Sequence, residues 1–171
     1  MCHPWFYHVR TCLQHEIASL KPGGRYGTVL DERVLFRTNE TAFVQTKRKL
    51  LEDCDLWCIV SLPGGVFTAA GAGAKTNLLF FTKGRPTESV WYYDLSDIKV
   101  GKKTPFTLDK FTDFFRLLPE RADSERSWTL TRAVSVRWIL ATNRAGRPAV
   151  RWRVVYGVSA SQCPPSFAWR S

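Results

Sequence analysis

The sequence lacks the features that would place this protein in a membrane or outside the cell. It has no run of about 18 apolar residues, which excludes a transmembrane helix. Met1 to Trp5 do not combine a cationic region with a following apolar stretch, so they do not form a secretory signal. The five cysteines are odd in number and scattered, which is typical of a reducing compartment rather than of a disulfide framework. We therefore expect a cytoplasmic protein with no membrane partner.

Acidic residues are missing from the last part of the chain. The net charge is +10, but residues 131–171 contain seven arginines and no Asp, Glu or Lys, so the preceding 130 residues carry only +3. A basic surface gains affinity for nucleic acid by releasing counterions from phosphates. Two explanations stay open for these residues: a basic tail that binds nucleic acid, or translation of a GC-rich coding region in a shifted frame.

With 171 residues, 44% of them hydrophobic, the chain can form one globular domain with a sizeable core. Apolar residues at helical spacing predict a first helix, which Lys21-Pro22-Gly23-Gly24 ends; they are Val9, Leu13, Ile17 and Leu20. Residues 26–30 are predicted to be a short buried strand. Asn39 can cap a second helix with Glu40 in its first turn, and its core face is formed by Phe43, Leu50, Leu51 and Cys54.

Three further strands are expected, at 56–62, 76–82 and 89–95. The first two are continuous apolar runs, which indicates burial on both faces of a sheet. No helix separates them, so we expect them to pair antiparallel. Thr107 can cap a last helix, with one apolar stripe formed by Leu108, Phe111, Phe115 and Leu118. These elements predict an α/β fold that contains the second half of a sheet.

Between Leu13 and Trp128 the sequence resembles the N6-adenine DNA methylase family, and within it the modification subunit of type I restriction–modification systems. The resemblance depends on an ordered series of blocks at the family's spacing. They are S-L-K-P-G-G-R-Y-G-T-V-L (19–30), V-L-F-R-T-N-E (34–40), K-R-K-L-L-E-D-C-D-L (47–56), I-V-S-L-P-G-G-V-F (59–67), A-G-A-G-A-K-T-N-L-L-F-F-T-K-G (70–84) and W-Y-Y-D-L-S-D-I-K-V-G-K-K-T-P (91–105).

This resemblance implies a partial Rossmann-like methyltransferase sheet. Residues 25–31, 56–62 and 76–82 would be its strands five, six and seven, with the last antiparallel. The family binds S-adenosylmethionine at a G-x-G turn after strand one, and it grips an extruded adenine with an N-P-P-F or N-P-P-Y motif after strand four. Neither motif is present in this sequence. We therefore expect no catalytic or cofactor-binding residues and no activity from this chain alone.

The connection over residues 63–77 is the best remaining candidate site. In relatives it helps to line the pocket for the extruded base, which implies substrate-binding roles for Phe67, Lys75, Thr76 and Asn77. The alternative is that Phe67 belongs to the core and the glycines only allow a turn. The implied partners are DNA and the specificity and restriction subunits of a type I system.

Other motifs favour structural roles. Gly71 to Thr76 differs from a phosphate-binding loop because Ala74 replaces the required glycine. The Cys and His residues between Cys2 and His15 fit no standard zinc spacing. Cys54 and Cys58 are expected to be core thiols. Lys99, Lys102 and Lys103 are expected on a solvated loop, and Trp91, Tyr92 and Tyr93 in sheet packing rather than in base stacking.

We divide the chain into an atypical N-terminal segment (1–12), a C-terminal part of a methyltransferase domain (13–129) and a basic tail (130–171). Two other functions stay open. One is a subunit-interaction module that uses residues 91–120, and the other is a nucleic-acid-binding protein that uses its tail.

Overall fold

The computed structural model describes residues 4–36, 41–68, 71, 73–101 and 103–131. The helical elements are α1 (Pro4–Ser19), α2 (Glu32–Phe36), α3 (Thr41–Asp53), the 3-10 helix η2 (Leu108–Phe111) and α4 (Thr112–Leu117). The strands are β1 (Arg25–Asp31), β2 (Cys54–Ser61), β3 (Thr76–Lys83), β4 (Ser89–Asp94) and β5 (Ser127–Thr131). No helix among the described residues is long and apolar enough to cross a bilayer.

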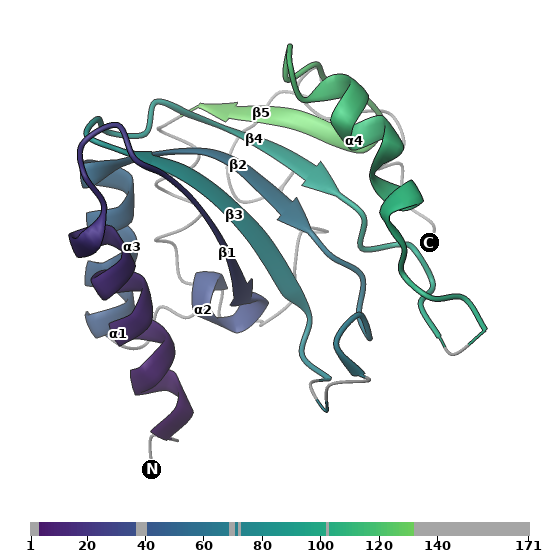
Figure 1. Cartoon of the computed structure of the whole chain (residues 1–171), viewed down its shortest axis with the longest axis horizontal. Coiled ribbons are helices and arrows are strands. Elements are labelled where there is room, and N and C mark those ends of the chain that lie inside the picture. Colours follow the sequence, from purple (N-terminus) through teal and green to yellow (C-terminus); the bar gives the residue numbers. More distant parts are fainter. Residues whose placement is uncertain (1–3, 37–40, 69–70, 72, 102, 132–171) are drawn as a thin grey trace, which may run out of the picture.

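One mixed sheet organises the molecule, with strand order β1-β3-β2-β4-β5 (Figure 1). β3 pairs antiparallel with both β1 and β2, which confirms the antiparallel pairing expected for the two apolar runs. β2 and β4 are parallel, and β5 is the other edge strand, antiparallel to β4. β1, β2 and β4 therefore point the same way, and their carboxyl ends meet at one edge of the sheet.

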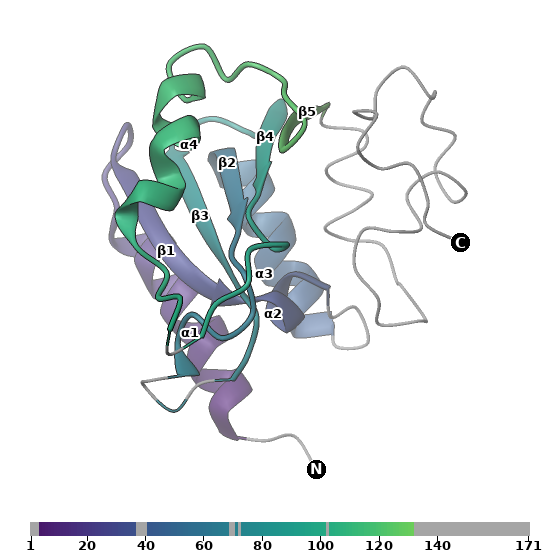
Figure 2. The same ribbon diagram turned by 90° about the vertical axis from the view of Figure 1, so that its right-hand side faces the viewer.

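Helices cover the two faces of the sheet unequally (Figures 1 and 2). We call the face under α1 and α3 the inner face, where Leu13, Ile17, Leu50 and Leu51 join strand residues such as Leu79 in one core. The opposite, outer face is covered by α4, whose Phe114 packs with Trp91 and Tyr93. Alternate residues of β3 thus contribute to two separate cores.

A β-bulge interrupts β2 where its register with β3 shifts between Leu56 and Cys58. The extra residue puts both Trp57 and Cys58 with the outer-face core. Thr87 braces the bulge from the chain before β4. Its fully buried hydroxyl donates to the Cys54 carbonyl at 2.7 Å and accepts the Leu56 N–H at 2.9 Å.

The burial predicted for residues 26–30 was wrong. In β1 only Leu30 is buried, and the side chain of Val29 is 48% exposed. The reason is position: β1 lies at the end of the strand order, so among the described residues it has one neighbouring strand and an open side. The predicted second helix is present, with Phe43, Leu50 and Leu51 buried. Cys54 is buried too, but it is the first residue of β2 and not part of the helix. Asn39 and Glu40 lie outside the described residues.

The stripe predicted for the last helix was half right: Phe111 and Leu118 pack against the outer-face core, but Leu108 and Phe115 do not. Phe114 is the buried residue, at 5% exposure, while Leu108 and Phe115 are 73% and 52% exposed. The first turn is the 3-10 helix η2, with about three residues per turn, so the helical face shifts before α4 begins. Thr107 precedes η2, but its side chain makes no capping bond to the backbone. The sequence also gave no clear signal for β5 or for the five-residue α2.

Candidate functional site

Polar residues collect where the carboxyl ends of the parallel strands meet. The strand register places Asn77 of β3 opposite both Leu30 of β1 and Ser61 of β2, and places Ser61 opposite Asp94 of β4. Thr76 lies opposite Asp31 on the other side of β3. Ligands of open α/β sheets bind outside this edge. We call Ser61, Thr76, Asn77 and the neighbouring Lys75 and Glu32 the carboxyl-edge cluster.

Two hydrogen-bonding groups at the start of β3 have no partner among the described residues. Asn77 is 1% exposed and Thr76 is 9% exposed, yet Asn77 Nδ2 and Thr76 Oγ1 make no hydrogen bond there. An amide N–H₂ or hydroxyl buried without a partner costs about 1–3 kcal/mol. Side chains alternate between the two faces along β3. Asn77 therefore points to the inner face, as Leu79 does, and Thr76 points to the outer face.

Lys75 is already engaged by the protein itself. Its Nζ lies 3.0 Å from Glu32 Oε1, and both side chains are mostly buried. The backbone reinforces this contact, because the Glu32 N–H donates to the Lys75 carbonyl at 2.9 Å. The pair ties the end of the β2–β3 connection to the start of α2. Its geometry makes Lys75 a fixed part of the edge rather than a free cation.

Phe67 lies in the turn after β2, whereas the other three predicted site residues are consecutive, from residue 75 into the first residues of β3. It is partly buried against the outer-face core, as the structural alternative for this residue expected. The connection around it turns at Gly65 and Gly71, with φ of 87° and 80°, values that glycine adopts without strain. The structure therefore gathers Lys75, Thr76 and Asn77 and leaves Phe67 in packing.

Sequence reasoning missed Ser61 and Glu32. Ser61 is 1% exposed at the end of an otherwise apolar strand. A lone hydroxyl at the end of such a run was the available signal, but only the register shows that it faces Asn77. Glu32 gave no signal, since its pairing with Lys75 spans residues far apart in sequence.

The cysteines near the sheet are not nucleophiles. Burial raises the pKa of the Cys54 thiol to about 11 and that of Cys58 to about 12. Both thiols are therefore protonated at neutral pH, and a thiol is reactive only as its thiolate. They are free and buried, which confirms the prediction of core thiols. In the described part of the chain no three His, Cys, Asp or Glu side chains could hold a metal ion together.

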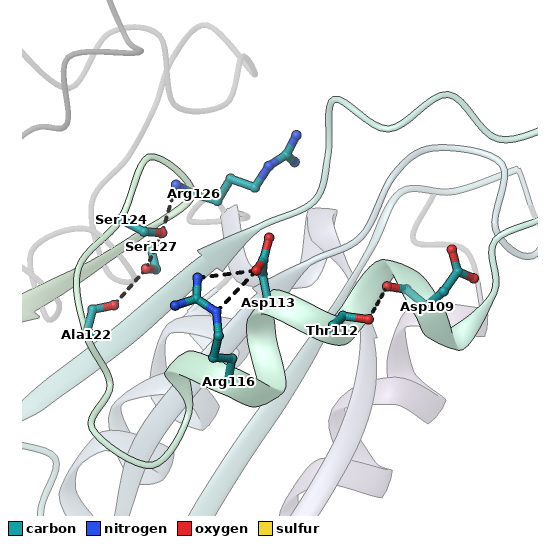
Figure 3. Close-up of polar contacts among 8 residues, drawn as sticks. All are labelled: Asp109, Thr112, Asp113, Arg116, Ala122, Ser124, Arg126 and Ser127. Carbon is teal, nitrogen blue, oxygen red and sulfur yellow. Dashed lines mark hydrogen bonds and ion pairs between the residues drawn. The ribbon is translucent and has the colours of Figure 1, made fainter.

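A second polar group lies between α4 and β5, and its charges are balanced internally (Figure 3). Arg116 contacts Asp113 at 3.3 Å, and Ser127 Oγ donates to the Ala122 carbonyl at 2.8 Å. Arg126 makes two bonds to Asp97, at 2.6 and 2.8 Å. The Ser127 contact closes the turn before β5, and Arg116 and Arg126 each have a carboxylate partner.

The remaining aromatic and basic candidates have structural positions. Trp91, Tyr92 and Tyr93 are buried in β4, which confirms sheet packing. Burial raises the pKa of Tyr92 well above its usual range. Lys99 and Lys103 are exposed as expected, whereas Lys102 lies outside the described residues.

The family model of N-6 DNA methylases matches residues 9–143. Among curated proteins, the chain is 38% identical over 129 residues to the type I restriction enzyme EcoKI methylase subunit of Escherichia coli (strain K12), covering 69% of this chain and 24% of that subunit. It is 40% identical over 116 residues to the type I restriction enzyme StySPI methylase subunit of Salmonella potsdam, covering 61% of this chain and 21% of that subunit. The chain therefore spans about a quarter or less of the length of these relatives.

Solved structures show the same relationship. A chain from a type I restriction–modification system, studied for complex assembly and conformational transition, has a TM-score of 0.69 and 33% identity, covering 81% of this chain and 32% of that chain. The structure of the EcoKI M protein has a TM-score of 0.63 and 31% identity, covering 73% of this chain and 34% of that chain. The residues that the family model matches, 9–143, include every strand of the sheet described above.

Proposed function

The chain belongs to the N-6 DNA methylase family, and we propose that it is part of a type I adenine-N6 DNA methyltransferase subunit that cannot transfer a methyl group by itself. The observation that carries the proposal is the sheet order β1-β3-β2, with antiparallel β3 between two strands that are parallel to each other. This is the order expected for strands five, seven and six of the family sheet. The partial Rossmann-like α/β fold agrees with its solved neighbours.

The described residues do not fit the methyl donor of the family, S-adenosylmethionine. A donor site needs a glycine turn that leads from a strand into a helix, so that backbone N–H groups approach the ligand. The turn from β1 into α2 contains no glycine, and its Glu32 is held by Lys75. Gly71 and Gly73 instead lie in the connection between antiparallel strands. We derive no chemical step through this donor.

We propose that residues 63–77 contribute to the pocket of an extruded adenine when the domain is complete. The buried Thr76 and Asn77 would supply hydrogen bonds, Lys75 would hold the connection in place through Glu32, and Phe67 would pack its far end. Extrusion is needed because the adenine amino group is unreachable inside the base stack. DNA, a specificity subunit and a restriction subunit are the partners that this function implies.

A subunit-interaction module is the second candidate, and one observation favours it. Leu108 and Phe115 expose 73% and 52% of their surfaces on the outward side of η2 and α4. Both residues lie within the stretch 91–120 that such a module would use, and large exposed apolar side chains can contribute to an interaction site. This surface would contact another subunit without any chemistry.

Two measurements on the full chain test the proposal. Calorimetric titration with S-adenosylmethionine should give no binding heat, and incubation with the labelled donor and DNA should leave adenine unlabelled. The EcoKI methylase subunit, assayed with its specificity subunit, provides the positive control. Labelled adenine produced by this chain alone would overturn the proposal.

A further inference from the structure

α2 is fixed in place by residues from two other elements. It follows β1 directly and lies on the same side of the sheet as α3 (Figure 2). At its start, the N–H and the side chain of Glu32 both contact Lys75. Near its end, the Leu35 carbonyl accepts a hydrogen bond from Lys47 Nζ of α3 at 2.9 Å. A helix of five residues has little stability of its own, so its place depends on these contacts and on the burial of Val34 and Leu35.

Lys47 is an unusual residue for the position that it occupies. It is buried, although lysine is almost never fully buried because its ammonium group loses hydration. Burial lowers the pKa of Lys47 to about 8, which reflects this cost. Other buried residues of α3, such as Phe43 and Leu50, are apolar. An apolar residue at position 47 would fill the space without the cost, so what the lysine adds is a directed hydrogen bond to α2.

The start of α2 meets the candidate site. Glu32 Oε1 lies 3.0 Å from Lys75 Nζ, and Thr76 and Asn77 follow Lys75 in the chain. From the β2 side, the Leu62 N–H donates to the Thr76 carbonyl at 3.0 Å. The first residues of β3 therefore lie between two contacts, one with the end of β2 and one with α2. A displacement of α2 would move the second contact and leave the first in place.

We infer that Lys47 is a positioning residue for the pocket of the extruded adenine. By holding α2, it keeps Glu32 against Lys75, and this pair keeps Thr76 and Asn77 in the arrangement that receives the base. The inference rests on the proposed function, because it concerns the same connection between β2 and β3. Lys47 acts through α2 and not by touching the base. Residues that act through one shared contact have non-additive effects, so substitutions of Lys47 and Glu32 should be coupled.

Hydrogen–deuterium exchange of the full chain, followed by mass spectrometry in dilute solution, tests this role locally. Lys47→Met removes the donor and keeps an unbranched side chain of similar length. Peptides that contain Glu32, and those that contain Thr76 and Asn77, should exchange about tenfold faster relative to peptides from β4, because local opening exposes their amides. Lys47→Arg keeps a donor and should restore most of the protection. Lys83→Met, the matched control, removes a comparable lysine–carbonyl bond at the end of α1 and should not change this ratio.

A second variant tests the route and decides the matter even if Lys47→Met does not fold. Glu32→Gln removes the charge of the ion pair and should speed exchange at Thr76 and Asn77. In this background, Lys47→Met should add less than it does alone. An equal rise in all peptides for Lys47→Met, no rise for Glu32→Gln, or additive effects of the two would overturn the inference. Labelled adenine produced by the chain alone would instead overturn the proposed function and leave the exchange result standing.

Discussion

At the scale of single residues, buried polar side chains in this protein hold irregular pieces of backbone in place. Thr87 forms hydrogen bonds with backbone groups at the bulge of β2, and Lys47 forms one with a carbonyl near the end of α2. Lys47 is 2% exposed, and its Nζ donates to the Leu35 carbonyl at 2.9 Å. Both residues lie in stretches where the sequence alone indicates nothing unusual. Their roles arise from contacts made at a distance along the chain.

We predict that Thr87→Val lowers the free energy of unfolding by about 1–3 kcal/mol. Valine keeps the shape of the side chain but leaves the Leu56 N–H and the Cys54 carbonyl unsatisfied in the core. Urea unfolding followed by tryptophan fluorescence measures the change. Thr129→Val, at an exposed position of β5, is the control and should change stability by less than about 0.5 kcal/mol. Equal effects of the two variants would contradict the bracing role.

Lys47 predicts a dependence of stability on alkaline pH. Burial lowers its pKa from the usual 10.5 to about 8. The unfolded chain therefore binds more protons than the folded one between about pH 8 and 10.5, and stability from this residue increases as pH rises through that window. Cys54 and Cys58 act in the opposite direction above about pH 9, because their pKa values are raised in the fold.

Comparison with Lys47→Met isolates the lysine, because the two cysteines contribute equally to both proteins. Relative to the variant, the unmodified chain should gain stability between pH 8 and 10 in urea titrations. Lys21→Met, at an exposed position, is the matched control for the loss of a lysine. A difference for Lys47→Met that stays constant over this range would show that Lys47 titrates alike in both states.

At the scale of elements, the position of a strand in the sheet and the type of helix determine which residues are buried, and the hydrophobic pattern of the sequence does not show either. β1 and β2 are both apolar in sequence, but β2 lies in the middle of the sheet and β1 at its end. β2 is therefore buried almost throughout, whereas β1 exposes alternate residues. The 3-10 turn of η2 similarly moved the buried position to Phe114.

The end of α1 is held by the sheet, which gives a prediction at this scale. Lys83 Nζ of β3 donates to the carbonyls of Leu20 and Ala18, at 2.8 and 3.2 Å. A cation here satisfies the final helix carbonyls and opposes the helix dipole. Lys83→Met should lower the free energy of unfolding by about 1 kcal/mol, measured in urea by circular dichroism. Lys21→Met, at the same helix end but exposed, should have a smaller effect.

At the scale of the whole molecule, β1 and β5 are the two edge strands of the described sheet, and β1 carries the exposed apolar side chain of Val29. An exposed strand edge with apolar side chains promotes association of like edges. We predict that the chain alone aggregates when concentrated and that Val29→Lys raises the soluble fraction, measured by sedimentation of the purified protein. Leu108→Lys removes a more exposed apolar residue outside the sheet and should help less. An equal gain from both variants would assign the aggregation to general surface apolarity.

The segment boundaries at residues 12 and 129 stay predictions. α1 runs from Pro4 to Ser19 without a break at residue 12, and the family match extends from residue 9 to residue 143. The basic residues after Thr131 lie outside the described part of the chain. A nucleic-acid-binding tail and a shifted reading frame therefore both stay open as explanations of the basic composition.

The sequence by itself determined the family, the α/β class and the position of the main strands, because these depend on local apolar runs, turn residues and ordered motifs. It also identified the stretch that contains Lys75, Thr76 and Asn77. Only the tertiary structure decided that Phe67 packs against the outer-face core, that Ser61 and Glu32 lie at the same sheet edge as these residues, and that β1 is an edge strand. Those facts depend on strand order and register, which bring together residues that no short stretch of sequence relates.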